Sequence, residues 1–193
     1  MVNTIPAVTM DDVSALLGGL PGEPFPVDWA GVEARLGVGL PADYKAFGSV
    51  YGPVTVGGWL TVLVPRRAAP DYFADLDRMQ GNQRVRRDLD PAANPYAFHP
   101  EPGGLLLWAT TDGQVELFWD TGSGPDPDGW STVAGTGDGW QPLPPMTTTQ
   151  VLAALLRGEL DVAPAARRPL PGNLDHRVWR AIAAGDEARR GAP

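Results

Sequence analysis

Residues 27–64 read VDWAGVEARLGVGLPADYKAFGSVYGPVTVGGWLTVLV, and this stretch decides the fold. Its first part predicts a short helix with an apolar stripe of three residues, Trp29, Val32 and Leu36. Asp28 can cap the N-terminus of this helix through its carboxylate. Gly37 follows where helices commonly end in a left-handed residue, so we expect the helix to stop there.

A second helix is predicted directly downstream. Pro41 suits its first turn, because the N–H that proline lacks would have no partner there, and the helix dipole favours Asp43 in the same turn. Gly52 and Pro53 end the helix after an apolar stripe made of Tyr44, Phe47 and Tyr51. Residues 59–64 are then apolar on both faces, which predicts a strand inside a sheet.

The order W..VE..LG..LP.DYKAF...YG, followed by a Gly-led apolar strand, resembles the SUKH superfamily. This superfamily holds the fungal cell-wall-assembly regulators and many bacterial toxin-immunity proteins. The resemblance extends more loosely through residues 105–120 and 151–160, and so covers most of the chain up to about residue 160. The matching positions are Trp29, Val32, Glu33, Leu36, Gly37, Leu40, Pro41, Tyr44, Phe47, Tyr51, Gly52, Gly58 and Leu60.

The rest of the chain predicts further helices and strands. Helices are expected over residues 9–17, 71–89, 147–157 and, in the tail, from Asn173. Strands are expected over residues 105–111, 114–120 and 130–133. Four prolines between residues 90 and 104 predict a surface loop.

The clearest strand signal is a hairpin around Asp112-Gly113, a dipeptide that favours a type I′ turn. A two-residue loop predicts three cross-strand pairs on one face, Thr110 with Val115, Trp108 with Leu117 and Leu106 with Trp119. We therefore expect an α+β fold, with helices packed against one side of a twisted, mainly antiparallel sheet, as the SUKH resemblance also implies.

The length of 193 residues suits one domain over residues 1–160, followed by an Ala/Pro/Arg-rich linker and C-terminal helix over residues 161–193. The sequence has no cysteine, which excludes disulfides and thiolate metal sites. It also has no basic, apolar leader and no run of about 18 apolar residues, so we expect a cytoplasmic protein that does not enter a membrane.

The full chain has a net charge of −8, and its negative charge is concentrated in the middle of the sequence. Between residues 101 and 161, Arg157 is the only base among these acids: Glu101, Asp112, Glu116, Asp120, Asp126, Asp128, Asp138, Glu159 and Asp161. Such a segment disfavours nucleic-acid backbones and favours a basic protein partner. The alternative is that these acids only keep the protein in solution.

The sequence carries no recognised catalytic, cofactor or metal motif. His99 and His176 stand outside any motif, and neither a Gly-x-Ser-x-Gly elbow nor a phosphate-binding loop occurs. Glu116 and Asp120 share one face of a strand but lie about 13 Å apart, too far for a paired acid and base. We therefore predict no catalytic residue, cofactor or metal ion.

The predicted binding face combines acids with two tryptophans beside glycine and aspartate in loops. Its members are Glu116, Asp120, Asp126, Asp128, Asp138, Trp130 and Trp140. Tryptophan is enriched at energetically important contacts, which makes Trp130 and Trp140 candidate anchors. The alternative is that both rings fold back over the sheet edge.

The resemblance implies a non-enzymatic binding protein. In bacteria most such proteins resemble immunity factors that neutralise secreted toxins, often nucleases or deaminases. An acidic protein of this kind would bind a basic toxin and occupy its active site. A regulatory scaffold similar to the fungal branch is the second expectation, and an enzyme with a concave small-molecule site is the third.

Overall fold

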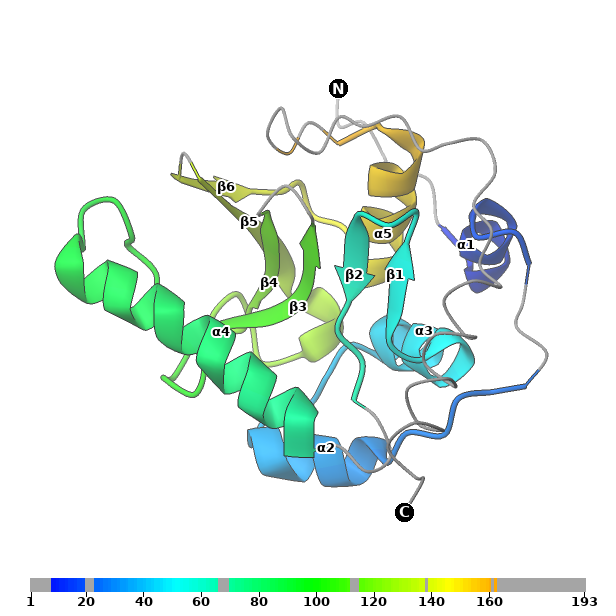
Figure 1. Cartoon of the computed structure of the whole chain (residues 1–193), viewed down its shortest axis with the longest axis horizontal. Helices are drawn as coiled ribbons and strands as arrows, with labels where there is room; N and C mark the ends of the chain where they lie inside the picture. The colour runs from blue at the N-terminus through cyan, green and yellow to red at the C-terminus, as the bar shows by residue number, and fades with distance from the viewer. Residues whose placement is uncertain are drawn as a thin grey trace, which may run out of the picture.

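The computed structural model describes residues 8–19, 23–65, 70–111, 115–137, 139–160 and 162. Within these ranges five α-helices accompany a six-stranded antiparallel sheet, which confirms the α+β class (Figure 1). The helices are α1 (Met10–Leu16), α2 (Trp29–Leu36), α3 (Ala42–Tyr51), α4 (Pro70–Leu89) and α5 (Thr148–Arg157). The strands are β1 (Val54–Val56), β2 (Leu60–Val62), β3 (Leu105–Thr111), β4 (Glu116–Asp120), β5 (Ser131–Thr136) and β6 (Gly139–Pro142).

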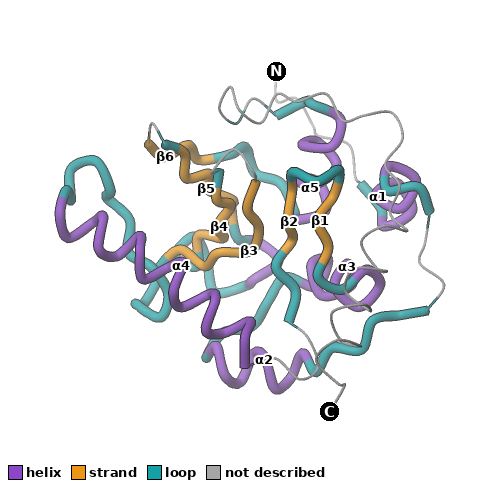
Figure 2. The backbone as a smooth tube through the Cα atoms, in the orientation of Figure 1, coloured by secondary structure: helices purple, strands orange, loops and turns teal. Residues whose placement is uncertain are grey.

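The six strands follow one another across the sheet in chain order, with β1 and β6 at its edges (Figure 2). The predicted interior strand is β2, which pairs with both β1 and β3. Strands β1 and β6 are not predicted by the sequence pattern, and β5 extends beyond its predicted end at residue 133. Residues 134–136 belong to β5, because Ala134 and Gly135 pair with both β4 and β6 and Thr136 pairs with β6.

The register of the β3–β4 hairpin differs from the prediction by one residue over half of its length. Leu106 lies opposite Trp119 as predicted, but Ala109 rather than Trp108 lies opposite Leu117. The cause is a β-bulge between Leu107 and Ala109, which places an extra residue in β3. At the bulge Trp108 is fully buried, and its ring stacks on Trp119 with centroids 5.8 Å apart.

Helices cover both faces of the sheet. On one face the indole N–H of Trp119 donates to Thr148 Oγ1 of α5 at 3.1 Å, and its ring packs edge-on against Tyr44 of α3 at 4.7 Å. On the other face the Gln83 side chain of α4 donates to the Glu116 carboxylate. The expected one-sided packing therefore holds for α3 and α5 but not for α4, which runs across the viewer's side of the sheet in Figure 1.

Side-chain caps and left-handed glycines set the ends of several helices. Thr9 with Asp12 and Thr147 with Gln150 make complete capping boxes at the starts of α1 and α5. Asp28 accepts a hydrogen bond from the backbone N–H of Gly31 at the start of α2. The left-handed residues Gly37 and Gly158 end α2 and α5.

A long-range contact joins the N-termini of α3 and α5. Asp43 Oδ2 accepts hydrogen bonds from Thr149 N–H at 2.7 Å and from Thr149 Oγ1 at 3.0 Å. In the α5 capping box, Thr147 Oγ1 accepts a hydrogen bond from the N–H of Gln150. The box provides no acceptor for the N–H of Thr149, and Asp43 accepts that hydrogen bond instead. The carboxylate that suited the first turn of α3 thus also caps a second helix.

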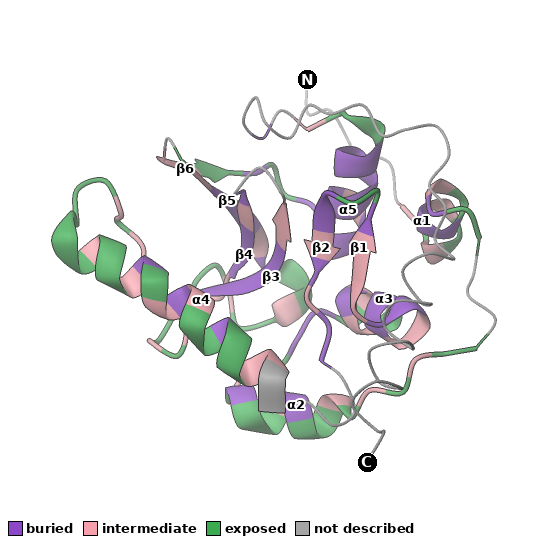
Figure 3. Cartoon of the chain, in the orientation of Figure 1, coloured by how far each residue is buried: buried purple, intermediate pink, exposed green. Residues whose placement is uncertain are grey.

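The core lies between the two helical layers and the sheet (Figure 3). The predicted surface loop after α4 contributes to it, since Phe98 is fully buried and packs against the rings of Phe118 and Trp140. Among the helices that the structure describes, none is both long and apolar enough to span a bilayer. The predicted tail helix lies outside the described residues.

Candidate functional site

A groove of about 830 Å³ lies between the C-terminal half of α4 and the face of the sheet that carries Glu116. Side chains from α4, from the turn after it and from β3 to β6 line its walls. The lining residues used below are Gln83, Arg86, Asn94, Thr110, Glu116 and Trp140. Two residues of the predicted binding face, Glu116 and Trp140, thus meet in one cavity.

Glu116 is the only acid among the described residues that line the groove. Its strand position turns the side chain toward α4, where Gln83 donates a hydrogen bond to one carboxylate oxygen. Burial raises the pKa of Glu116, while the hydrogen bond from Gln83 and the positive charge of Arg86 act in the lowering direction. No ion pair within 4.0 Å reaches this carboxylate from the described part of the chain.

Trp140 forms the aromatic wall of the groove. It lies opposite Gly135 in the β5–β6 pair, and a Cβ at Gly135 would come within 2.9 Å of the indole. Its ring also contacts Tyr96, Phe98 and Phe118, with centroids 5.3–5.6 Å apart. The indole N–H donates to Asn94 Oδ1 at 3.3 Å. Trp140 therefore folds back over the sheet and keeps only part of its surface exposed toward the groove.

Three of the other predicted acids, Asp120, Asp126 and Asp128, do not line this groove. Asp120 Oδ1 accepts from Gly122 N–H at 3.0 Å, and Asp126 Oδ1 accepts from Asp128 N–H at 3.1 Å at the start of the 3₁₀ helix η1 (Pro127–Gly129). Asp128 Oδ1 accepts from Ala42 N–H at the start of α3. These three carboxylates order turns and a helix end. Asp138 lies outside the described residues.

Trp130 is not a surface anchor, in contrast to the prediction. Its side chain is only 7% exposed, and its indole N–H donates to the Gly124 carbonyl at 2.8 Å. The ring lies near Trp119, with centroids 6.4 Å apart. The correction follows from the turn over residues 121–129, which closes back over the ring instead of presenting it to solvent. Trp130 thus belongs to the core.

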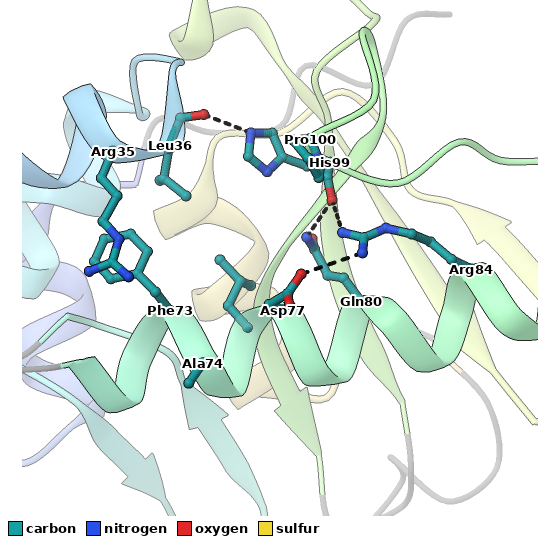
Figure 4. Close-up of a pocket in the computed structure, with 10 residues that line it drawn as sticks. Arg35, Leu36, Phe73, Ala74, Asp77, Gln80, Arg84, His99 and Pro100 are labelled. Atoms are coloured by element: carbon teal, nitrogen blue, oxygen red, sulfur yellow. Dashed lines mark hydrogen bonds and ion pairs between the residues drawn. The ribbon is translucent and has the colours of Figure 1, made fainter.

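A second, shallower pocket of about 380 Å³ lies on the opposite flank of α4, beside the end of α2 (Figure 4). His99 belongs to the predicted surface loop but is half-buried here, and its Nε2 lies 2.9 Å from the Leu36 carbonyl. Burial lowers the pKa of His99. The His99 carbonyl in turn accepts from Gln80 and Arg84 of α4. These hydrogen bonds connect α2, the loop that carries His99 and α4, so the pocket is a structural junction between α2 and α4.

The described residues contain no cluster of three His, Cys, Asp or Glu side chains that could hold a metal ion. Comparison with models of known protein families, with curated proteins and with solved structures found no match. The candidate site therefore depends on the geometry of this chain alone.

The α4 wall of the groove is not among the predicted site residues. On α4, Leu76, Met79, Gln80 and Gln83 follow one another along the face that packs on the sheet. Both glutamines are buried, at 2% and 4% exposure. A polar residue that continues an apolar helical stripe requires a buried hydrogen-bond partner, and this signal could have pointed to the contact with Glu116.

Proposed function

We propose that this chain is a non-enzymatic, cytoplasmic protein-binding domain whose partner is a basic protein. The observation that carries the proposal is the half-buried Glu116 carboxylate in an open groove, where no cation within the described chain forms an ion pair with it. A carboxylate held away from water is stabilised by a complementary charge, and a basic partner supplies that charge.

The resemblance to the SUKH superfamily gives this binding function a specific form, that of an immunity protein that neutralises a secreted toxin. A toxin that cleaves nucleic acid needs a basic surface to bind phosphate groups. A chain with a net charge of −8 attracts such a surface over long range, which raises the association rate and makes it sensitive to salt.

A second candidate is a regulatory scaffold that binds several endogenous proteins. It is favoured by Val85 and Leu89 on α4, the large apolar side chains that stand out from the described surface at 57% and 81% exposure. They follow each other at a spacing of four residues, so they lie on one face of the helix. A scaffold needs a second contact surface of this kind in addition to the groove.

Affinity capture from native cell extract, at low and then at high salt, tests the two candidates. One basic partner that is released as salt rises, and whose toxic activity the purified chain abolishes at a 1:1 ratio, would support the immunity function. Several partners that persist at high salt, and that are lost from a Val85→Ser, Leu89→Ser variant, would support the scaffold. Recovery of acidic partners alone would contradict the proposal.

A further inference from the structure

The Glu116 carboxylate has unused hydrogen-bonding capacity. Two carboxylate oxygens offer about four acceptor positions. Within the described chain, Gln83 is its one hydrogen-bond donor, and this donor binds Oε2. The Oε1 atom therefore has acceptor positions available to a ligand that enters the groove.

The groove has its own cation, yet that cation leaves the position beside Glu116 open. Arg86 is an exposed side chain of α4, and its charge is near enough to act on the pKa of Glu116. It makes no ion pair within 4.0 Å with any described carboxylate. An incoming cation can thus reach the carboxylate without breaking an existing ion pair.

The aromatic wall favours one kind of cation. Guanidinium is planar, pairs with a carboxylate through two parallel hydrogen bonds and stacks on aromatic rings. Trp140 lines the same groove as Glu116 and is held in place by Phe98, Phe118 and Asn94. An ammonium group offers a point charge without the planar match.

We propose that the groove binds an arginine side chain of the protein partner, with Glu116 as the acceptor of its guanidinium and Trp140 as the surface on which it stacks. This inference rests on the proposed function, since it identifies which group of a basic partner the groove recognises.

The test uses the purified full chain and capped tripeptides. Ac-Gly-Arg-Gly-NH₂ is titrated while the indole N–H resonance of Trp140, assigned with a Trp140→Phe variant, is followed by NMR. We expect a saturable shift. The citrulline tripeptide, which keeps the shape but not the charge, and the lysine tripeptide should each bind at least about 10-fold more weakly, because a charged bidentate pair is lost.

Two variants make the test specific. Glu116→Gln keeps an acceptor for Gln83 but removes the charge, and should weaken the arginine tripeptide at least about 10-fold. Asp120→Asn removes the same charge from the other end of β4, keeps an acceptor for Gly122 and should leave binding unchanged. Absence of a shift, equal binding of the citrulline or lysine tripeptide, or equal loss in both variants would each overturn the inference.

This outcome is separable from that of the proposed function. If the tripeptide binds as expected but capture yields no toxin, the groove assignment stands and the immunity function fails. If a toxin is captured and inhibited while the tripeptide does not bind, the immunity function stands and the groove assignment fails.

Discussion

Replacement of Asp43 by alanine should destabilise the fold more than any exposed acid can. The carboxylate accepts two hydrogen bonds from Thr149, whose side chain is only 3% exposed, so water cannot replace it easily. A hydrogen bond to a charged group contributes about 1.5–3 kcal/mol, and a buried N–H left without a partner costs about 1–3 kcal/mol. We expect Asp43→Ala to lower the free energy of unfolding by about 3 kcal/mol.

Urea unfolding followed by tryptophan fluorescence measures this loss, with an unchanged m-value expected. For a domain of this size the melting temperature should fall by roughly 6–12 °C. Asp75→Ala is the matched control, because among the described residues Asp75 pairs with Arg78 alone, on the exposed side of α4, and its loss should cost under about 0.5 kcal/mol. Thr149→Val should couple to Asp43→Ala by about 1 kcal/mol in a double-mutant cycle. Equal losses for Asp43→Ala and Asp75→Ala, or no coupling to Thr149, would refute this account of the α3–α5 contact.

The remaining predictions concern the groove, the α2–α4 junction and the corrected anchor. Burial raises the pKa of Glu116 above its ordinary 4.5, so this carboxyl contributes stability below that pH and loses it as pH rises through the raised pKa. Glu116→Gln should therefore raise the melting temperature at about pH 7 and not at about pH 4, and an equal rise at both would contradict it. Burial lowers the pKa of His99 below 6.5, so its contribution is present above that pH and is lost as pH falls through the lowered value. His99→Gln, which keeps a donor for the Leu36 carbonyl, should flatten the loss of stability on acidification in a thermal-melt series, and an unchanged slope would argue against this role for the contact. Trp130→Ala should cost about 3–5 kcal/mol in urea unfolding, as expected for a core ring, and a loss under about 1 kcal/mol would restore it as a surface residue.

Local signals in the sequence were sufficient for the five helices that the structure describes. A capping box such as Thr147 with Gln150 involves only four consecutive residues, and a left-handed glycine such as Gly37 ends the helix that directly precedes it. Both signals can therefore be predicted before any tertiary contact is known. The Asp112-Gly113 dipeptide located the β3–β4 hairpin for the same reason, although Thr110 lies opposite Glu116 and not opposite Val115, as a two-residue loop predicted.

Strand pairing could not be predicted in the same way. The edge strands β1 and β6 have only three and four residues, too short to show a period, and they exist because a neighbouring strand pairs with them. The bulge at Trp108 was hidden because residues 105–109 read LLLWA. A one-residue shift in such a run leaves apolar side chains on both faces, so alternation does not fix the register.

For a related reason, the sequence could not show which members of the predicted binding face lie together. An aspartate beside glycine or proline in a loop is the same pattern whether it binds a partner or caps a turn, and Asp126 and Asp128 do the second. Glu116 differs because it lies within a strand on a face that a helix covers, where a carboxylate is unfavourable unless the site uses it. Reversing the loop acids to lysine would therefore disturb the caps of η1 and α3 as well as any interface, and would not separate binding from folding. The pair Glu116→Gln and Asp120→Asn separates binding from folding. Each variant keeps a side-chain oxygen that accepts the native hydrogen bond, from Gln83 or from Gly122 N–H, and only Glu116→Gln removes a charge from the groove.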